Sequence, residues 1–363
     1  MAQQESTAQI STNNKSIMTE IMESIPGALL VIAVAVLAYY VGPWLKHNFV
    51  FFKEYLTLKS FILAILFGII IKNTVGVPKI FEPGLRFSTI LTKTGIVVMG
   101  AKYSMAKLLE VGTPALVFTV VFLFGSALVM MWVGKRMKMS TALTACLASG
   151  LSVCGVSATV AVAPAVGAKN RDMAYSIAVV LMFGLLALLI FPIIGHALNM
   201  TDAQYGAFAG IGIVNSAQVL AAGFGYSDEA GVVAGVYNIG RVIFLPFVVL
   251  MVAIMATSME VERTGVKAKE INKMKMLVDK FPLFVVGFLI VVMLNTMGLF
   301  EKPEVKLMKH FMSWAFLLGF ASIGLTTRLA DLKAAGWSGF VLGFVIASIK
   351  AGLALLVVMT VMS

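Results

Sequence analysis

Residues 140–168 read STALTACLASGLSVCGVSATVAVAPAVGA. This stretch is apolar and exceeds the 20 or so residues that a membrane-spanning helix needs. Glycine and proline nevertheless interrupt it at Gly150, Gly155 and Pro164, and several serine and threonine side chains lie between them. Irregular backbone at membrane depth is tolerated only where it is buried in protein or lines a cavity. The stretch therefore predicts a broken or re-entrant helical segment inside a membrane protein.

A second stretch, residues 203–225, has the same character. It reads AQYGAFAGIGIVNSAQVLAAGFG, with Asn215, Ser216 and Gln218 at its centre. A small-residue packing motif, in which glycine and serine let helices approach closely, is the alternative interpretation of both stretches. Because two related stretches carry polar groups at matching positions, we favour a binding function for them.

The composition of the whole chain agrees with a membrane protein. Of the 363 residues, 60% are hydrophobic and 12% are charged, and the mean hydropathy is +0.97. A soluble fold could not cover its surface with so few polar side chains, so we exclude a soluble enzyme. The Lys and Arg residues that give the net charge of +11 lie mostly in short loops. This distribution fits the positive-inside rule of membrane proteins better than nucleic-acid binding.

We expect an all-α polytopic membrane protein with eleven apolar segments. They are residues 26–45, 58–71, 86–103, 112–134, 140–168, 172–198, 203–225, 228–257, 281–299, 305–325 and 336–362. Residues 1–25 form a polar tail that lacks the pattern of a cleaved signal peptide. Two cysteines and three scattered histidines predict no metal site and no disulfide framework.

Internal similarity predicts that the chain contains a permuted repeat. Ser157-Ala158-Thr159-Val160 matches Ser216-Ala217-Gln218-Val219, and each is followed by an acidic residue and, some twenty residues later, a proline. Residues 98–112 match residues 322–336. Lysine and arginine flank 140–168, whereas the links around 203–225 carry none. We therefore expect two re-entrant hairpins from opposite faces within an inverted-repeat transporter of about nine transmembrane helices, with the N-terminus inside.

The tips of such hairpins could bind an anion, since the second half of each hairpin starts there with free backbone N–H groups. Ser157, and Asn215 or Ser216, have the side chains of N-cap residues. The predicted substrate-binding residues are Ser152, Cys154, Gly155, Val156, Ser157, Asn215, Ser216, Gln218 and Arg241.

Three cations lie within apolar segments, whereas all Asp and Glu residues lie in loops, in the tail or at segment ends. Arg241 lies near mid-bilayer, where a charge is costly and marks a functional site by default. It could instead bond backbone carbonyls at a broken helix. Lys93 and Lys350 are candidate charge partners, although Lys93 could reach an interface and Lys350 could be neutral. Cations without intramembrane carboxylates favour an anionic substrate.

These residues resemble a known family. LTKTGIVVMG (91–100), SGLSVCGVSATVAVAP (149–164), SAQVLAAG (216–223), Arg241-Val242 and residues 324–336 are similar to the YeiH-type sulfate exporter family of bacterial inner-membrane proteins. The resemblance covers roughly residues 58–361 and is most specific at the Cys-Gly-x-Ser-Ala core. The family is grouped with the bile acid/sodium symporter superfamily, which implies discontinuous helices, a panel domain, a core domain and elevator-like alternating access.

That relationship implies a domain division of the chain. After the 1–25 tail, residues 26–57 would form a peripheral helix and loop, and residues 58–111 and 281–335 the panel. Residues 112–257 and 336–363 would form the core that carries the two discontinuous helices.

The chain also departs from the family pattern. Val214, Asn215 and Ser216 replace the His-Asp-Thr usually found before Ala-Gln, and Asn238 replaces a usual Lys. These losses put proton coupling in doubt. Oxygen atoms of Thr159, Asn215, Gln218 and Asn238 are candidate ligands for a coupling Na⁺, a hard cation.

The resulting hypothesis is a secondary transporter of a small anion, sulfate, sulfite or an organosulfonate, across the bacterial inner membrane, with export suggested by the family. A sodium-coupled symporter for an organic acid is the alternative. An intramembrane enzyme is disfavoured because no Ser/His pair, paired carboxylate or metal set lies at membrane depth. We expect no cofactor other than Na⁺, no nucleic-acid partner, contact with membrane lipid, and a homodimer as a candidate assembly.

Overall fold

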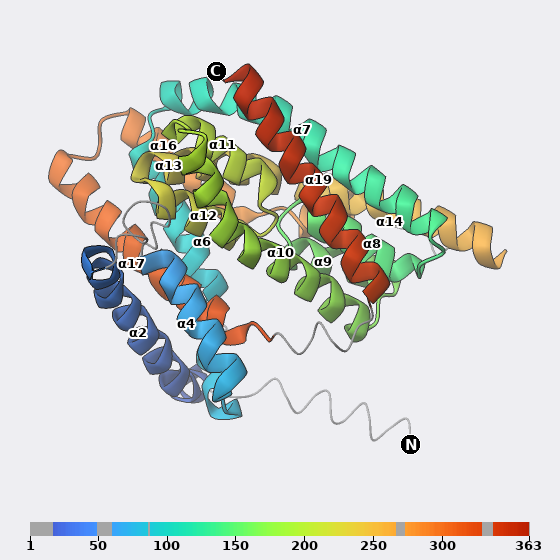
Figure 1. Cartoon of the computed structure of the whole chain (residues 1–363), viewed down its shortest axis with the longest axis horizontal. Helices are drawn as coiled ribbons and strands as arrows, with labels where there is room; N and C mark the ends of the chain where they lie inside the picture. The colour runs from blue at the N-terminus through green and yellow to red at the C-terminus, as the bar shows by residue number, and fades with distance from the viewer. Residues whose placement is uncertain (1–16, 49–59, 86–87, 266–272, 329–336, 363) are drawn as a thin grey trace.

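The computed structural model describes residues 17–48, 60–85, 88–265, 273–328 and 337–362, which form helices joined by turns (Figure 1). The helices are α2 (Ile17–Asn48), α4 (Ser60–Thr74), α5 (Glu82–Leu85), α6 (Ser88–Met99), α7 (Met105–Arg136), α8 (Thr141–Ser152), α9 (Val156–Val162), α10 (Asn170–Ala197), α11 (Asp202–Gly212), α12 (Ser216–Tyr226), α13 (Asp228–Ile243), α14 (Leu245–Thr264), α15 (Lys273–Asp279), α16 (Leu283–Thr296), α17 (Lys302–Thr326) and α19 (Trp337–Val361), with short 3₁₀ turns η2 (Lys79–Phe81), η3 (Gly100–Lys102) and η4 (Ala163–Val166). In these residues, five helices are long and apolar enough to cross a membrane.

One group of helices, which we call the α4–α17 group, consists of α2, α4, α5, α6, α16 and α17. Its centre is a close crossing of α4 and α17. A Cβ on Gly68 would lie 2.6 Å from Leu325 N, and a Cβ on Gly324 would lie 2.3 Å from Ile65 O. Backbone therefore packs directly on backbone, as small residues permit between membrane helices.

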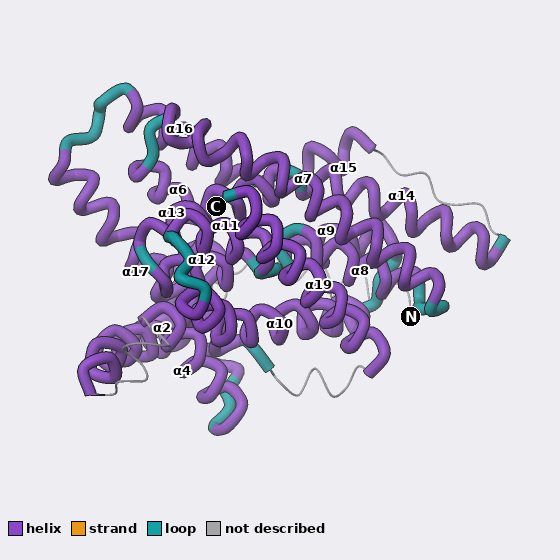
Figure 2. The backbone as a smooth tube through the Cα atoms, turned by 45° about the horizontal axis from the view of Figure 1, so that its top comes forward, coloured by secondary structure: helices purple, strands orange, loops and turns teal. Residues whose placement is uncertain are grey.

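The second group, the hairpin group, contains α7 to α14 and α19. In Figure 1, α10 and α19 cross the middle of the molecule, with α2 and α4 on one side and α14 on the other. The short helices α8, α9, α11 and α12 contact the longer helices α7, α10, α13, α14 and α19 (Figure 2). The most deeply buried polar side chains, including Thr159, Asn238 and Arg241, belong to this group.

Contacts between helix termini define two ends of the molecule. At the basic end, Asn73 donates to Thr327 O (3.0 Å), and Lys135 pairs with Glu262 (2.5 Å). At the opposite end, the Met105 N–H donates to Thr296 Oγ1 (2.8 Å). The basic residues in the last turn of α7, Lys135 and Arg136, lie at the basic end.

Residues 140–168 form a hairpin, which we call hairpin 1. Thr159 Oγ1 in α9 donates to Cys146 O in α8 at 3.3 Å, whereas a continuous helix would separate these residues by about 20 Å along its axis. The chain therefore turns back on itself after α8. Hairpin 1 enters from the basic end, because Thr141, at the start of α8, bonds Glu260 near the end of α14.

Residues 203–225 form hairpin 2 in the same way. The rings of Tyr205 in α11 and Tyr226 in α12 stack with centroids 3.8 Å apart, so the start of one helix lies beside the end of the next. Gln204 donates to Met362 O, after the last turn of α19. Hairpin 2 therefore enters from the opposite end.

Three boundaries differ from the sequence-based expectation. Helix α2 begins at Ile17, inside the expected tail, of which residues 1–16 lie outside the described part. The expected core boundary at residue 112 falls within α7. The single segment expected over 228–257 is two helices, because Pro246 stands in the first turn of α14 and a proline lacks the N–H that would continue α13.

Candidate functional site

The tips of the two hairpins meet inside the hairpin group. A Cβ built on Gly155 would lie 3.3 Å from Asn215 Nδ2 and 3.5 Å from Asn215 Cα. Gly155 belongs to the turn of hairpin 1, and Asn215 to that of hairpin 2. The structure thus brings together the centres of the two interrupted stretches.

At the tip of hairpin 1, Gly155 is the N-cap of α9, with a φ of 72°. That left-handed backbone favours glycine. No side chain caps α9, so the prediction of Ser157 as the N-cap was wrong. Ser157 lies in the first turn of α9, where it is exposed, and Val156 is half-buried. Because the turn needs a positive φ, glycine takes the position that a serine cap would have occupied.

At the tip of hairpin 2, the Asn215 cap is confirmed. Asn215 Oδ1 accepts from the N–H groups of Ala217 (3.0 Å) and Gln218 (3.3 Å). These donors are therefore already satisfied by the protein. Ser216 is the first residue of α12, and its buried hydroxyl has no partner.

Arg241 is 1% exposed and lies in the last turn of α13. Its Nη1 donates to Ile213 O at 2.6 Å, and its Nη2 to Asn238 Oδ1 at 3.2 Å. Ile213 is the C-cap of α11, where unsatisfied carbonyls attract a cation. Since arginine can only donate, this contact orients Asn238 with its Nδ2 donor turned away from Arg241.

Lys350, in α19, contacts hairpin 1 in the way that Arg241 contacts hairpin 2. It is 4% exposed, and its Nζ donates to Leu151 O (3.1 Å) and Ser152 O (3.4 Å). These are the last two residues of α8. Each hairpin therefore has one buried cation at the carbonyl end of its first helix, and the two cations lie within electrostatic reach of each other.

No carboxylate balances these two charges among the described side chains. The described ion pairs, such as Lys135 with Glu262 and Lys309 with Asp228, are solvent-exposed. Several buried polar atoms around the tips also have no hydrogen-bond partner; they are Ser149 Oγ, Ser216 Oγ, Gln218 Oε1, Asn238 Nδ2 and Arg241 Nε. Buried polar groups without a hydrogen-bond partner are rare in native proteins, so these atoms are candidates for contact with a ligand.

The candidate sodium ligands do not all converge. Thr159 Oγ1 contacts Gly155 O (3.0 Å), Cys146 O and, in α10, Ser176 Oγ (3.1 Å), which together form an oxygen-rich cluster between hairpin 1 and α10. Gln218 Nε2 instead donates to Leu181 O (2.9 Å). Asn215 Oδ1 is occupied by its capping role. Among the described side chains, Gln218 Oε1 and Ser216 Oγ are therefore acceptors without a hydrogen-bond partner at the tip of hairpin 2.

Lys93 lies apart from the buried cations, in α6 of the α4–α17 group. It is exposed, and its Nζ sits 5.7 Å from the centre of the Phe284 ring. Lys93 is still near enough to act electrostatically on Cys154 at the tip of hairpin 1. Cys154 is 6% exposed and contacts Ser157 and the Ala158 backbone.

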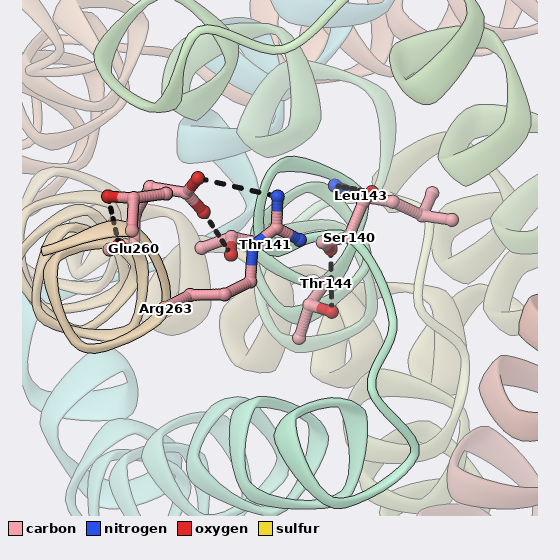
Figure 3. Close-up of polar contacts among 7 residues, drawn as sticks. Ser140, Thr141, Leu143, Thr144, Glu260 and Arg263 are labelled. Carbon is pink, nitrogen blue, oxygen red and sulfur yellow. Dashed lines mark hydrogen bonds and ion pairs between the residues drawn. The ribbon is translucent and has the colours of Figure 1, made fainter.

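The root of hairpin 1 is anchored to α14 (Figure 3). Thr141 Oγ1 donates to Glu260 Oε2 at 2.6 Å, and Arg263 Nη2 pairs with Glu260 Oε1 at 3.5 Å. Ser140 caps α8 by accepting from the Leu143 N–H (3.3 Å). The hairpin is thus attached to its own helix group at its base.

Sequence reasoning missed one polar neighbour of the site, Ser126. Its Oγ donates to Ser152 Oγ at 3.2 Å. Ser126 follows Gly112 at the same spacing at which Lys350 follows Gly336. The internal repeat was thus the available signal, since it pairs Ser126 with Lys350. No group of metal-binding side chains occurs in the residues that the structure describes.

Comparisons with known proteins identify the family of the chain. A family described as "Conserved hypothetical protein 698" matches residues 26–343. A "UPF0324 membrane protein" of Nitratidesulfovibrio vulgaris is 66% identical over 96% of both chains. One from Clostridium tetani is 29% identical over 82% of this chain and 88% of its own.

No solved structure matches significantly. The relatives are named membrane proteins, and the described part of the chain contains several apolar helices. The chain is therefore a multi-pass bacterial membrane protein of the conserved hypothetical protein 698 family (UPF0324), which is the YeiH-type family.

Proposed function

We propose that the protein is a secondary transporter of a small anion. The observation that carries this proposal is the pair of buried cations, Arg241 and Lys350, at the meeting point of two hairpin tips without a described carboxylate partner. Burying an unbalanced charge is costly, and burying two near each other is costlier. An anion between the tips would offset that cost.

The donors around Arg241 also suit an anion. Arg241 Nε and Asn238 Nδ2 have no partner in the protein, and both residues lie one turn apart on α13. Arg241 Nη2 holds Asn238 by its oxygen, which leaves the amide donor for a ligand. Charge-assisted hydrogen bonds to oxyanions are about twice as strong as neutral ones.

We propose an inverted-repeat architecture with nine crossings of the inner membrane and two hairpins. The crossings are α2, α4, α6, α7, α10, α13 with α14, α16, α17 and α19. The contacts that place hairpin 1 at the basic end and hairpin 2 at the opposite end support this arrangement. By the positive-inside rule, the basic end is cytoplasmic.

In this proposal the hairpin group is the core that moves, and the α4–α17 group is the panel. The core would carry the anion between the two membrane faces by elevator-like alternating access. Sulfate, sulfite and organosulfonates are the substrate class that the family resemblance favours, with export as the direction. A homodimer would place two panels together in the membrane.

Sodium-coupled uptake of an organic acid is the second candidate. It is favoured by Gln218 Oε1, a buried acceptor without a partner, and by the oxygen cluster around Thr159. Cation binding to these oxygens would couple to the anion through the shared hairpin tips. Since no Asp or Glu is buried among the described side chains, Na⁺ is a more suitable coupling ion in this proposal than a proton.

Counterflow in proteoliposomes tests the proposal. Vesicles preloaded with unlabelled sulfate, sulfite, taurine or acetate would be diluted into the same labelled compound, with Na⁺ or choline outside. We expect labelled sulfur oxyanion to accumulate in vesicles with wild-type protein and not with Arg241→Gln. Arg136→Gln, an exposed arginine beside Trp132, is the control and should retain uptake. Absence of counterflow with all four compounds would contradict the transporter proposal.

A further inference from the structure

The two helix groups make polar contacts at the opposite end of the molecule. Tyr103, which follows η3 in the α4–α17 group, donates its hydroxyl to Val232 O in α13 of the hairpin group. Lys309 Nζ in α17 pairs with Asp228 Oδ2 in the first turn of α13 at 2.5 Å. Both contacts join the groups across the same few turns of α13.

Apolar contacts in the same region bring the two groups into close packing. A Cβ on Gly235 would lie 2.5 Å from Met99 Cε, and one on Gly225 would lie 2.9 Å from Ile62 Cδ1. The Phe224 ring in α12 packs against Phe61 of α4, with centroids 6.1 Å apart. Side chains of the α4–α17 group thus pack directly against α12 and α13 towards the opposite end.

The basic end is different. In the described part of the chain, the extensive helix contacts of α4, α6, α16 and α17 do not include α8, α9 or α10. Ser157 is exposed, and Val160 on the next turn of α9 is 50% exposed. Lys93 is exposed on α6. The described residues therefore leave side chains of α9 exposed directly after the tip of hairpin 1.

We propose that this conformation is open to the basic end and closed at the opposite end by an outer gate consisting of Tyr103 with Val232 and Lys309 with Asp228. This inference rests on the proposed function, since it assigns the direction from which the transported anion reaches the tips in this state. Lys93 would be the first cation that the anion meets on the way to Arg241.

The chemistry of the outer gate suits a contact that breaks in every transport cycle. Lys309 and Asp228 have side chains that are 47% and 42% exposed, and exposed ion pairs contribute little net free energy. Tyr103 donates an uncharged hydroxyl to a backbone carbonyl. Replacing it by phenylalanine therefore removes the contact and leaves no unpaired charge. Loss of both contacts should therefore shift the equilibrium between the two states instead of unfolding the protein.

Accessibility of a single cysteine tests the outer gate without a substrate. The probe is Ser157→Cys in a Cys146→Ala, Cys154→Ala background, labelled with a membrane-impermeant maleimide in inside-out and right-side-out vesicles. With the intact gate we expect rapid labelling from the cytoplasmic side and at least tenfold slower labelling from outside. With Tyr103→Phe and Asp228→Asn together, labelling from outside should rise severalfold. Asp202→Asn, an exposed acid on the same end, is the matched control and should change nothing.

Labelling from outside at equal rates with the gate intact would overturn the proposal, and so would an unchanged rate in the gate variant. Lys309→Gln, at an exposed position, repeats the test if the double variant folds poorly. The result is independent of the proposed function. If the cysteine labels as expected but no counterflow is observed, the outer gate is supported and the transporter proposal is contradicted.

Discussion

The backbone of Gly155 lies against Asn215, so two hairpins that enter from opposite ends of the molecule meet at their tips. Helix ends that would otherwise leave carbonyl groups unsatisfied lie on both sides of this contact. Arg241 bonds the carbonyl end of α11, and Lys350 bonds that of α8. Both basic side chains thus support the fold by bonding the carbonyl ends of the first helices of the two hairpins.

Asn238→Asp should abolish anion binding without unfolding the protein. The new carboxylate would face Arg241 Nη2 at the present 3.2 Å and provide the counter-ion that the anion otherwise supplies. We expect at least a tenfold weaker sulfate affinity, a loss of about 1.4 kcal/mol, with an unchanged or raised melting temperature. Equilibrium binding of labelled sulfate measures this. Asn170→Asp, at the exposed start of α10, is the control; equal affinity of Asn238→Asp and wild type would refute the prediction.

Gly155→Ala should destabilise the protein through both its backbone and its neighbours. A methyl group there would lie 2.6 Å from Val180 Cγ1, on a residue with φ of 72°. The backbone strain alone costs about 1–3 kcal/mol. Gly167→Ala separates backbone strain from steric contact. Gly167 also has a positive φ of 61°, but a Cβ there would meet no atom within 4 Å. A lower thermal midpoint for Gly155→Ala than for Gly167→Ala is expected, and the reverse order would show that the tip contact is loose.

Lys350→Met should separate charge from packing in α19. The methionine keeps an unbranched apolar chain but loses the donors to Leu151 O and Ser152 O. Replacing a buried charge by an apolar group is often neutral or stabilising, so we expect a nearly unchanged melting temperature. Sulfate-dependent stabilisation should fall, because one of two cations is gone. Full retention of that stabilisation would restrict the anion site to Arg241.

The topology predicts which link positions share a membrane face. Single cysteines at Arg136 and Asn170 flank hairpin 1 and should react with an impermeant thiol reagent from the cytoplasmic side. Cysteines at Ala203 and Glu229 flank hairpin 2 and should react from the other side. Opposite sidedness of Arg136 and Asn170 would mean that hairpin 1 spans the membrane, contrary to its folded-back geometry.

Much of this site could be predicted from the sequence. The helix breakers around Gly155 and the polar centre at Asn215 identified the two interrupted stretches, and the flanking charges indicated opposite entry. Hairpins that enter from opposite faces point towards each other, so the contact of Gly155 with Asn215 agrees with the expected entry directions. Arg241 stood out since a charge in an apolar segment is rare.

Other features depend on tertiary contacts that the sequence does not encode locally. Whether Ser157 or Gly155 caps α9 depends on the φ of one turn residue. The partner of Lys350 is a pair of backbone carbonyls on hairpin 1, far away in the chain. The break at Phe244 was also missed, because Pro192 stands inside the continuous helix α10 whereas Pro246 begins a new helix.

The central claim is that Arg241 lies in an anion site. The most direct test is the thermal midpoint of the purified protein against sulfate, sulfite, thiosulfate, taurine, isethionate and acetate, each as the sodium and the choline salt. A ligand at 100 times its Kd that binds only the folded state stabilises it by about 2.7 kcal/mol. We predict a concentration-dependent rise with a sulfur oxyanion in the wild type and in Arg136→Gln, and none in Arg241→Gln. An equal rise in Arg241→Gln would contradict the account.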